Sequence, residues 1–446
     1  MQNTTLEIAI LGLMLVLLVR PAYALAAYIS VLFWYPSYLV VSIGTIDISA
    51  SRIVVTVLLL RCLCDGRIRK KFTWSRLDTW VALSMFIYVV PYCITRPLST
   101  AIENRGGFLI DTWFAYIVAR LLVTDRASLV SVIKCVSIVL IPLALLGVVE
   151  SLTGWQPFLP LGRFCPWYEQ GISIRARWGL NRAIGPFNHP ILFGCTFAMF
   201  LPLIYYLRHE KNKWHILAYV LSGTAFVGAL SSMSSGPWVM AIVAIFCLAL
   251  ERHKHRVKPL FIFFIFSFVF VEIASNRTFY HVVASYANPL GGAGWHRAKL
   301  IDLAIEHFDK WWLAGYGGED PGWGRYLGMS RTDVTNQFIL NGVRYGILGI
   351  IALCAVLTTA FYSILRTYKN TAEPTLKSLC WSLGCVLASV IVTWMSVSFF
   401  GQILTLFYII LGIIGSSPNL MRRFGSAPKV AAFSPTGVSP HFQQIR

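Results

Sequence analysis

The chain has 446 residues, of which 57% are hydrophobic and only 13% are charged, and its formal net charge is +19. Soluble globular proteins contain about 45–50% apolar and about 25% charged residues. This composition therefore excludes a disordered chain, a disulfide scaffold and an ordinary soluble enzyme, and it indicates a polytopic membrane protein. Because Lys and Arg collect in the cytoplasmic loops of such proteins, the charge does not indicate a nucleic-acid partner.

Apolar runs follow one another along the whole chain, and a run of about 20 apolar residues crosses a bilayer as a helix. The runs cover residues 6–19, 22–40, 46–60, 77–94, 106–123, 128–149, 188–207, 215–230, 237–250, 259–274, 334–365, 379–400 and 403–415. Only Arg20 and Pro21 separate the first two runs. We therefore expect an all-α fold with about 12 (12 or 13) membrane-spanning helices.

Four short basic loops predict the orientation of these spans. They lie at 61–76, 208–213, 252–258 and 366–377. Counting the spans between them places all four on one side, which the positive-inside rule assigns to the cytoplasm. We expect residues 1–415 to form a single membrane domain and the Ser- and Pro-containing tail at 416–446 to be disordered in the cytoplasm.

Two longer loops, 151–187 and 275–333, then face outward, and the second is long enough for a small folded cap. Within it, residues 298–312 have helical periodicity. One face of that helix carries Leu300, Ile301, Ala304, Ile305, Phe308 and Trp312. This pattern predicts an amphipathic helix that lies on the membrane surface or packs against the spans. The glycines at 315–324 indicate a turn region, because the Lys and the helix start of a Walker motif are missing.

The outward loops are unexpectedly rich in arginine. The loop at 151–187 has no Lys and only one acidic residue, and its arginines are Arg163, Arg175, Arg177 and Arg182. A guanidinium group binds phosphate oxygens through two parallel hydrogen bonds, so these residues predict a phosphate-bearing ligand, with lipid head-group anchoring as the alternative. Neither loop contains a D-x-D pair, and no zinc-type H-E-x-x-H motif is present. We therefore expect a site without a metal ion.

Three segments together resemble the O-antigen ligase and O-antigen polymerase family of bacterial membrane glycosyltransferases. Residues 182–190 (RAIGPFNHP) are similar to the family's R-x-x-G-x-F-x-(N/H)-P segment. Residues 295–297 (WHR), with a helix and then GYG at 315–317, are similar to its Arg before a helix and a G-x-G turn. Residues 333–340 (DVTNQFIL), followed by GILG at 346–349, resemble its H-N-x-x-L and G-x-x-G.

The chain departs from the family pattern at two places. The family's His before Asn is Thr335 here, and its frequent Ser-Arg-Gly at an outward span end is Ser234-Ser235-Gly236. Ligases that transfer O-antigen to lipid A-core generally keep that His. The resemblance therefore favours a divergent polymerase of the exopolysaccharide or capsule type, with an O-antigen ligase as the alternative.

The resemblance implies a GT-C-like glycosyltransferase of the bacterial inner membrane, with its active site facing the periplasm. The implied donor is a glycan on polyprenyl diphosphate, and the implied acceptor is a glycan or a lipid-linked glycan. A chain-length regulator and a flippase of the same pathway are further expected partners, and no cofactor is implied. A transporter or flippase of lipid-linked sugars is a competing hypothesis, but the duplicated half with broken helices that would indicate it is not visible in the sequence. A non-enzymatic membrane scaffold is a third.

Four residues are expected to be catalytic. Arg182 and Arg297 are the first choices for contacts to the diphosphate. Asp333 is the carboxylate candidate for orienting or deprotonating the acceptor hydroxyl, or it caps the helix that follows. Asn336 is expected to bond to sugar or phosphate, or only to a neighbouring helix.

Five further residues are expected to contact the substrate. Arg177 and Arg344 are second choices for the diphosphate, and Asn188 and Thr335 lie within the matched segments. His189 precedes a proline at the start of a span, which is typical of a structural interface residue but also allows a role as a base.

Ionisable residues near the ends of spans are expected to be structural, because such groups are costly in the membrane and face partners. They are Asp47, Arg52, Asp111, Arg120, Glu150 and Glu272. Of these, Asp47 and Arg52 are expected to pair with each other or to reach the membrane interface.

Overall fold

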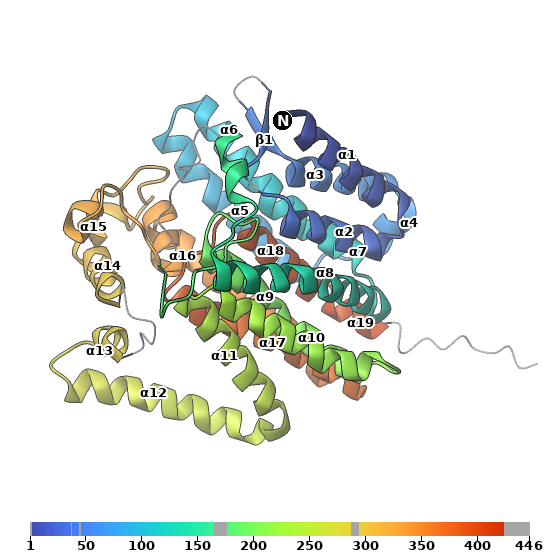
Figure 1. Ribbon diagram of the computed structural model, residues 1–446. Helices are drawn as coiled ribbons and strands as arrows, with labels where there is room; N and C mark the ends of the chain where they lie inside the picture. The colour runs from blue at the N-terminus through green and yellow to red at the C-terminus, as the bar shows by residue number, and fades with distance from the viewer. Residues whose placement is uncertain (1, 37, 44–45, 165–175, 287–293, 423–446) are drawn as a thin grey trace, which may run out of the picture.

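The computed structural model describes residues 2–36, 38–43, 46–164, 176–286 and 294–422. It is 78% helical, and helices form one bundle with a small cap at one end (Figure 1). Within those ranges, seven helices are long and apolar enough to cross a membrane, and they cover 76–95, 126–153, 190–209, 214–231, 235–274, 337–370 and 374–394. Shorter apolar helices cover 7–18, 21–34 and 402–415. A helical membrane protein is thus confirmed, and the count of 12 or 13 spans stays a prediction.

The first part of the chain forms one side of the bundle. Its helices are α1 (Gln2–Leu18), α2 (Pro21–Trp34), α3 (Ala50–Cys64), α4 (Gly66–Arg69), α5 (Arg76–Thr95), α6 (Leu98–Leu109), the π-helix η1 (Ile110–Phe114), α7 (Ala115–Leu122) and α8 (Arg126–Thr153). The predicted span at 46–60 begins later, because β1 (Val40–Ile43) and β2 (Ile46–Ser49) form an antiparallel hairpin in which Val40 pairs with Ser49. The fold is otherwise helical, as expected, and this hairpin is a small addition to it.

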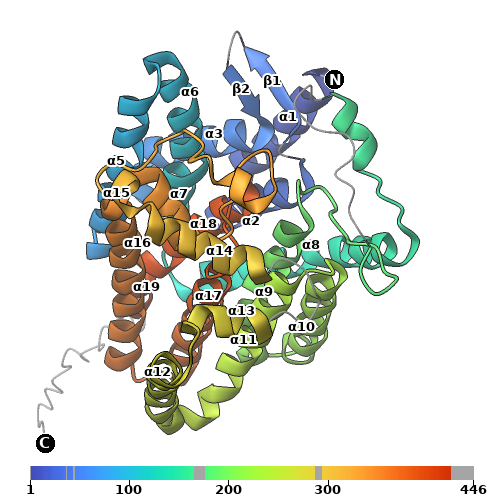
Figure 2. The ribbon, with the colours of Figure 1, turned by 90° about the vertical axis from the view of Figure 1, so that its left-hand side faces the viewer.

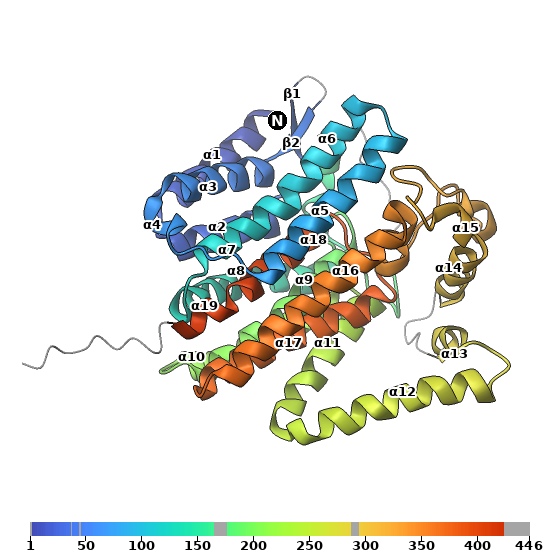
Figure 3. The same ribbon diagram turned by 180° about the vertical axis from the view of Figure 1, so that it is seen from behind.

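The rest of the chain adds the other side and the cap. Its helices are η2 (Leu159–Phe164), α9 (Pro190–Tyr206), η3 (Leu207–His209), α10 (Trp214–Ser231), α11 (Ser235–Ala249), η4 (Leu250–Arg256), α12 (Val257–Ala274), α13 (Phe279–Tyr286), α14 (Gly294–Glu306), α15 (Phe308–Trp311), η5 (Trp323–Leu327), α16 (Gln337–Asn370), α17 (Pro374–Trp394), α18 (Gln402–Gly415) and α19 (Ser417–Arg422). Figures 2 and 3 show the bundle from the side and from behind.

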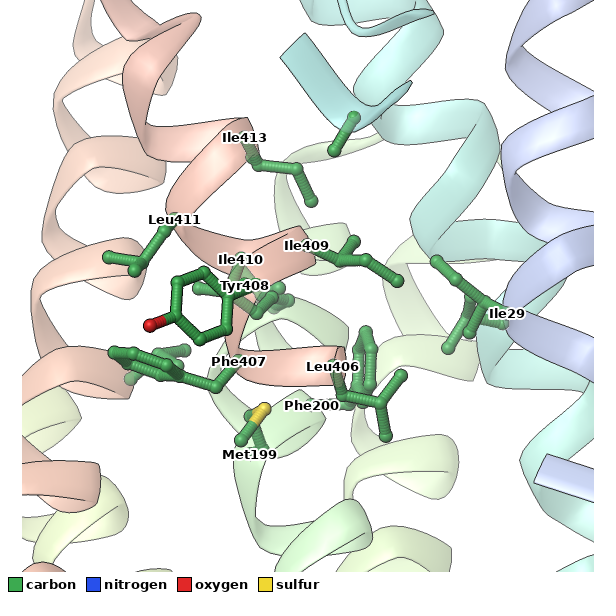
Figure 4. Close-up of a cluster of buried hydrophobic side chains, with 14 of the residues drawn as sticks. Ile29, Met199, Phe200, Leu406, Phe407, Tyr408, Ile409, Ile410, Leu411 and Ile413 are labelled. Carbon is green, nitrogen blue, oxygen red and sulfur yellow. The ribbon is translucent and has the colours of Figure 1, made fainter. Parts of the chain in front are cut away.

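The helix α9 forms the centre of the bundle. It packs against α8, α10, α11, α17 and α18, and 89% of its apolar window is buried. Figure 4 shows Met199 and Phe200 of α9 meeting Ile29 of α2 and the apolar side chains of α18. A helix that is hydrophobic on all sides is stable only where all sides are covered. The segment that leads into α9 is therefore attached to a helix that is covered on most sides.

The helix α12 has the opposite environment. None of its residues is buried, and its packing contacts are with η4 and α13, its neighbours along the chain. It stands apart from the bundle in Figures 1 and 3. Its whole apolar surface, which includes Phe261, Phe264 and Phe268, is exposed. Such a surface is suited to contact with lipid.

Two buried or half-buried ion pairs join helices inside the bundle. Arg52 of α3 contacts Asp111 of the π-helix at 2.7 Å, and its Nη1 also donates to the backbone carbonyl of Asp47. Arg120 of α7 contacts Asp78 of α5 at 2.7 Å, and both side chains are almost fully buried. Because removing one partner would leave an uncompensated buried charge, these pairs are structural, as the sequence predicts. The carboxylate partner of Arg52 is Asp111.

The cap differs from the predicted amphipathic helix. The helix breaks at His307, between α14 and α15. Its buried face consists of Leu300, Leu303, Ala304 and Trp311, whereas three residues expected on that face are exposed, namely Ile305, Phe308 and Trp312. The break rotates the second part of the face, and the helix packs on α16 and η5. The expected apolar face at 298–312 was therefore wrong in its second half.

The cap contacts α16 closely at glycines that belong to two of the three segments with a resemblance to the family. The φ angle of Gly346 is +71° and its ψ is −171°, so α16 is interrupted there. The Ile347 N–H donates to the carbonyl of Trp312 at 2.7 Å, and the Tyr316 N–H donates to that of Val343 at 2.6 Å. A Cβ on Gly315 would lie 2.6 Å from the backbone of Arg344. Only glycine permits this approach of two backbones.

The helical part of the chain extends beyond residue 416, where the disordered tail was predicted to begin. Residues 417–422 form α19, and Ser416 and Ser417 are fully buried. The Ser417 hydroxyl lies 3.2 Å from the hydroxyl of Ser363 on α16. The remainder of the expected tail, 423–446, lies outside the described residues.

Candidate functional site

The site is built on the segment between α8 and α9, which starts with a tight turn. Arg177 and Leu180 exchange both backbone hydrogen bonds, and the two residues between them have positive φ, 53° at Trp178 and 76° at Gly179. These values are those of a type I′ turn. The Trp178 ring packs edge-on against Trp238 of α11, with centroids 5.8 Å apart. The turn therefore fixes the position of Arg177 relative to α11.

The residues around Arg182 are fixed by the helix ends. Ser151, at the end of α8, accepts a backbone hydrogen bond from Asn181 and donates its hydroxyl to the Asn181 carbonyl. On the other side, the Ala183 N–H donates to the carbonyl of Ser231, at the end of α10. The backbone of Arg182 is thus held between two helices before its side chain makes any contact.

The buried carboxylate of Glu150 holds Ile184 and Gly185, the two residues that follow Ala183. Oε2 of Glu150, which is 1% exposed, accepts hydrogen bonds from the N–H groups of Ile184 and Gly185, at 2.8 and 2.9 Å. Gly185 has a φ of +54°, and a Cβ there would lie 2.9 Å from the Phe193 ring. Glu150 is therefore structural, as expected, and it holds the loop that carries the site.

The arginine side chains point to the turn between α10 and α11. Nη2 of Arg182 donates to the Ser234 hydroxyl at 2.8 Å, and Nη1 of Arg177 donates to the Met233 carbonyl at 3.3 Å. Met233 itself is buried and has a φ of +44°, a conformation that costs energy for a residue with a side chain. Sequence reasoning missed these two residues as parts of the site. The departure at Ser234-Ser235-Gly236 was the available signal.

Arg297, on the first turn of α14, joins these two residues from the loop at 275–333. We call Arg177, Arg182 and Arg297 the arginine cluster. Burial, with repulsion from Arg177, lowers the pKa of Arg182 to about 10, and the same two effects lower the pKa of Arg297. Both groups stay charged at neutral pH. Within the described part of the chain, none of the three forms an ion pair with a carboxylate.

Unpartnered polar atoms accompany the cluster. Nε of Arg182 and Nε of Arg297 are buried and have no hydrogen-bond partner. The same is true of Oδ1 of Asn188 and Oγ1 of Thr335, both in segments that sequence analysis assigned to the site. Most buried polar groups in folded proteins are hydrogen-bonded. The two unpaired guanidinium donors, together with three positive charges that pair with no described carboxylate, are suited to binding an anion that carries several oxygens.

His189 lies beside the cluster and caps α9. Its Nδ1 accepts a hydrogen bond from the Ile191 N–H at 3.1 Å, and its ring contacts Phe400. Burial and repulsion from Arg182 and Arg177 lower the pKa of His189 to about 4. The ring is therefore neutral at pH 7 with its proton on Nε2. Because the capping bond already uses the basic nitrogen, His189 is a hydrogen-bond donor and cannot act as the base here.

The segment before α16 places its polar residues differently from the expectation. Asn336 is the N-cap, since its Oδ1 accepts from the N–H groups of Phe338 and Ile339 while its Nδ2 donates to the Met395 carbonyl. The alternative in which Asp333 caps this helix is therefore wrong. Asn336 thus makes the contact to a neighbouring helix that sequence analysis left open as an alternative, and the second N–H of its Nδ2 keeps the bond to sugar or phosphate a prediction.

Asp333 is exposed and lies near His296, the neighbour of Arg297. Burial lowers the pKa of His296, against an opposing attraction from Asp333. Both ring nitrogens of His296 are buried without a partner. Asp333 is thus free of a capping role and accessible at the edge of the site, which leaves the sequence-based hypothesis of an acceptor-side carboxylate in place.

The remaining candidates lie elsewhere or cannot be placed. Arg344 is exposed on α16 and lines a separate recess between helices. Arg175 lies outside the described residues. Among the residues that the structure describes, no three His, Cys, Asp or Glu side chains gather in a way that could hold a metal ion.

Comparisons with known proteins add no assignment. The chain matches no protein-family model, and no curated protein is a significant match. The family that the three segments resemble therefore stays a prediction.

Proposed function

We propose that the protein is a glycosyltransferase that transfers a glycan from a polyprenyl diphosphate carrier to a glycan or lipid-linked acceptor. The observation that supports this most is the arginine cluster, in which segments from two loops bring together three guanidinium groups that pair with no carboxylate in the described part of the chain. A lipid diphosphate supplies the oxygens and the negative charge that this arrangement lacks. The apolar helices around it suit a donor that is anchored in the bilayer.

The proposed reaction needs charge stabilisation more than acid catalysis. The acceptor hydroxyl oxygen attacks the anomeric carbon, the bond from that carbon to the diphosphate oxygen breaks, and the diphosphate leaves with the electron pair. Arg182 and Arg297 stabilise the charge that develops on the leaving oxygens. Preorganised donors of this kind contribute about 10²–10³-fold each in rate. The guanidinium groups supply positive charge that a divalent metal ion supplies in other transferases.

The hydroxyl proton requires an acceptor, and Asp333 is the best candidate. It is exposed, it is not used as a helix cap, and it lies near His296 beside the cluster. His189 is disfavoured because its Nδ1 already accepts the Ile191 N–H. General-base assistance contributes about 10²–10⁴-fold in rate.

The test is chain elongation by the purified protein. Polyprenyl-diphosphate oligosaccharide, extracted from a strain that lacks the gene, is supplied in detergent, and the products are separated by length. We expect longer glycans with wild-type protein, and a loss of about 100-fold or more with Arg182→Gln or Arg297→Gln. Arg331→Gln, a change of an exposed arginine in the same outward loop, is the matched control and should elongate normally.

Three results would overturn parts of this proposal. Full activity of both Arg182→Gln and Arg297→Gln would remove the site assignment. Transfer to lipid A-core without elongation would indicate the ligase. Movement of labelled lipid-linked sugar across vesicles without any new glycosidic bond would indicate a flippase.

A further inference from the structure

A second site-like feature lies between α5, α16, α17 and α18, apart from the arginine cluster. It is a narrow recess, partly open to solvent, and its walls include Tyr88, Tyr345, Trp394 and Tyr408, one from each helix. Arg344 lies at the same recess and is exposed. The recess therefore combines several aromatic faces with one cation.

The aromatic wall is held rigidly by its own hydrogen bonds. The rings of Tyr88 and Tyr345 are stacked, with centroids 4.5 Å apart. Nη1 of Arg105 donates to the Tyr345 hydroxyl at 2.9 Å, and Nδ2 of Asn341 donates to the Tyr88 hydroxyl at 2.9 Å. A wall ordered in this way costs little further entropy when a ligand binds.

The wall formed by α17 and α18 carries a polar group that the protein does not satisfy. Trp394 is 1% exposed, and its Nε1 is buried without a hydrogen-bond partner. Tyr408, which is 6% exposed, lines the recess on the same side. Buried indole groups usually find a partner. An unpaired indole N–H at the recess indicates that a ligand supplies the partner.

The recess and the arginine cluster share one loop, between α17 and α18. The N–H of Phe399, which lines the recess, donates to Oε1 of Gln337 at 2.7 Å. The next residue, Phe400, contacts the ring of His189 beside the arginine cluster. A substrate held by its diphosphate at the cluster would therefore have this recess as its neighbour.

We propose that the recess binds a sugar unit of the glycan substrate. The apolar C–H face of a sugar stacks on aromatic rings, while its hydroxyls accept from the Trp394 and Tyr408 groups and from Arg344. An isoprenoid chain fits less well, because it would leave the buried Trp394 Nε1 unpaired. The inference rests on the proposed function, in that a glycan substrate must have a binding surface beside its diphosphate.

The test is saturation-transfer NMR on the full-length protein in detergent. The probes are methyl glycosides of glucose, galactose, mannose, rhamnose and glucuronic acid, and farnesol is the lipid probe. We expect saturation transfer to at least one glycoside, and an affinity that falls about three- to tenfold in Trp394→Phe and in Tyr408→Phe, each of which removes one hydrogen-bonding group and keeps a ring.

Matched controls separate binding from folding. Trp381→Phe changes another Trp of α17, whose Nε1 donates to the Cys247 carbonyl, and Tyr362→Phe changes an exposed Tyr of α16. Both should bind as wild type. If Trp394→Phe does not fold, the milder Tyr408→Phe gives the answer alone.

Several outcomes would overturn the inference. They are no saturation transfer to any glycoside, equal affinities in wild type and both variants, or loss of the signal on addition of farnesol. Arg182→Gln distinguishes this inference from the proposed function. It should leave glycoside binding unchanged, whatever its effect on elongation.

Discussion

The arginine residues of the cluster are charged but largely shielded from water. A buried charge without a partner is costly, and here three positive charges also repel one another, as the lowered pKa values of Arg182 and Arg297 express. Among the residues that the structure describes, no carboxylate pairs with them to compensate for this cost. The arrangement is therefore unfavourable without a ligand and favourable with an anion.

This imbalance predicts that removal of one arginine stabilises the ligand-free protein. Arg182→Gln should raise the free energy of unfolding by about 1 kcal/mol, after allowance for the solvent that still reaches the side chain, because it removes a repelling charge and keeps a donor for Ser234. Thermal unfolding in detergent measures the change. A lower unfolding temperature for this variant would contradict the uncompensated charge.

His189 gives a prediction for how the stability of the protein depends on pH. Its pKa in the folded protein, about 4, lies below its ordinary value of about 6.5, so the folded state binds fewer protons than the unfolded state between these values. The contribution of the neutral His189 ring to the free energy of unfolding is complete above pH 6.5, and it is lost as the pH falls towards 4. Between pH 7 and pH 5 the wild type should lose about 2 kcal/mol from this group.

The comparison variant is His189→Asn, because Asn also caps helices well and does not titrate. Thermal unfolding at pH 7 and pH 5 should show a smaller loss of stability in His189→Asn than in the wild type. Equal losses in the two proteins would mean that His189 is not held neutral by its surroundings.

At the scale of elements, the interruption of α16 and the turn after α15 act as one unit. The Gly346→Ala substitution places a Cβ 2.3 Å from the carbonyl oxygen of Leu313 and forces a residue with a side chain to adopt a φ of +71°. We expect a loss of at least about 1–3 kcal/mol in stability. Gly384→Ala, in the middle of α17 with open space around it, is the matched control.

Thermal unfolding and protease sensitivity of the cap measure this effect. The control should be neutral or slightly stabilising, because Ala is about 0.5–1 kcal/mol better than Gly inside a helix. Equal stabilities of the two variants would show that the contact between Gly346 and the cap does not hold α16 to α14 and α15.

Whether the sequence predicts an element depends on the physical interaction that forms it. Long apolar runs predict α5, α8, α9 and α10 to within a few residues, because burial in lipid depends on composition alone. The break at His307 and the start of α16 depend on local capping, and Asn336 rather than Asp333 supplies the cap. Hairpin pairing at Val40–Ile43 depends on a partner strand, which an apolar run does not reveal.

The site was predicted to a similar extent. Arg177, Arg182 and Arg297 do come together, as the arginine-rich composition of these loops suggested. The contact of Arg182 with Ser234 and the unusual backbone of Met233 were not predicted. Both depend on how α10 ends against α11, which is a tertiary contact, and the sequence signals it only through the departure at Ser234-Ser235-Gly236.

At the scale of the whole molecule, the topology separates two sets of charges. The arginine cluster lies where α8 ends and α9 begins. The basic loop at 208–213 lies at the other end of α9, and the basic loop at 61–76 lies between α3 and α5. Because Lys and Arg are kept in the cytoplasm during insertion, the arginine cluster should face outward.

Cysteine labelling tests this orientation. Ser330→Cys lies in the outward loop and Lys70→Cys lies in a basic loop, and both positions are exposed. In a background without Cys64, Cys93, Cys165 and Cys354, an impermeant maleimide added to spheroplasts should label Ser330→Cys, and should label Lys70→Cys only after lysis. The reverse pattern would place the cluster in the cytoplasm and would contradict the proposed donor site.

The most direct test of the account is the affinity of the purified protein for farnesyl diphosphate. Wild type should bind it far more tightly than farnesol, and Arg182→Gln and Arg297→Gln should each weaken binding about ten- to hundredfold, the value of one charge-assisted hydrogen bond. Arg331→Gln should bind as wild type. Equal affinities for farnesyl diphosphate and farnesol, or unchanged binding in both cluster variants, would contradict the claim that the arginine cluster holds a lipid diphosphate.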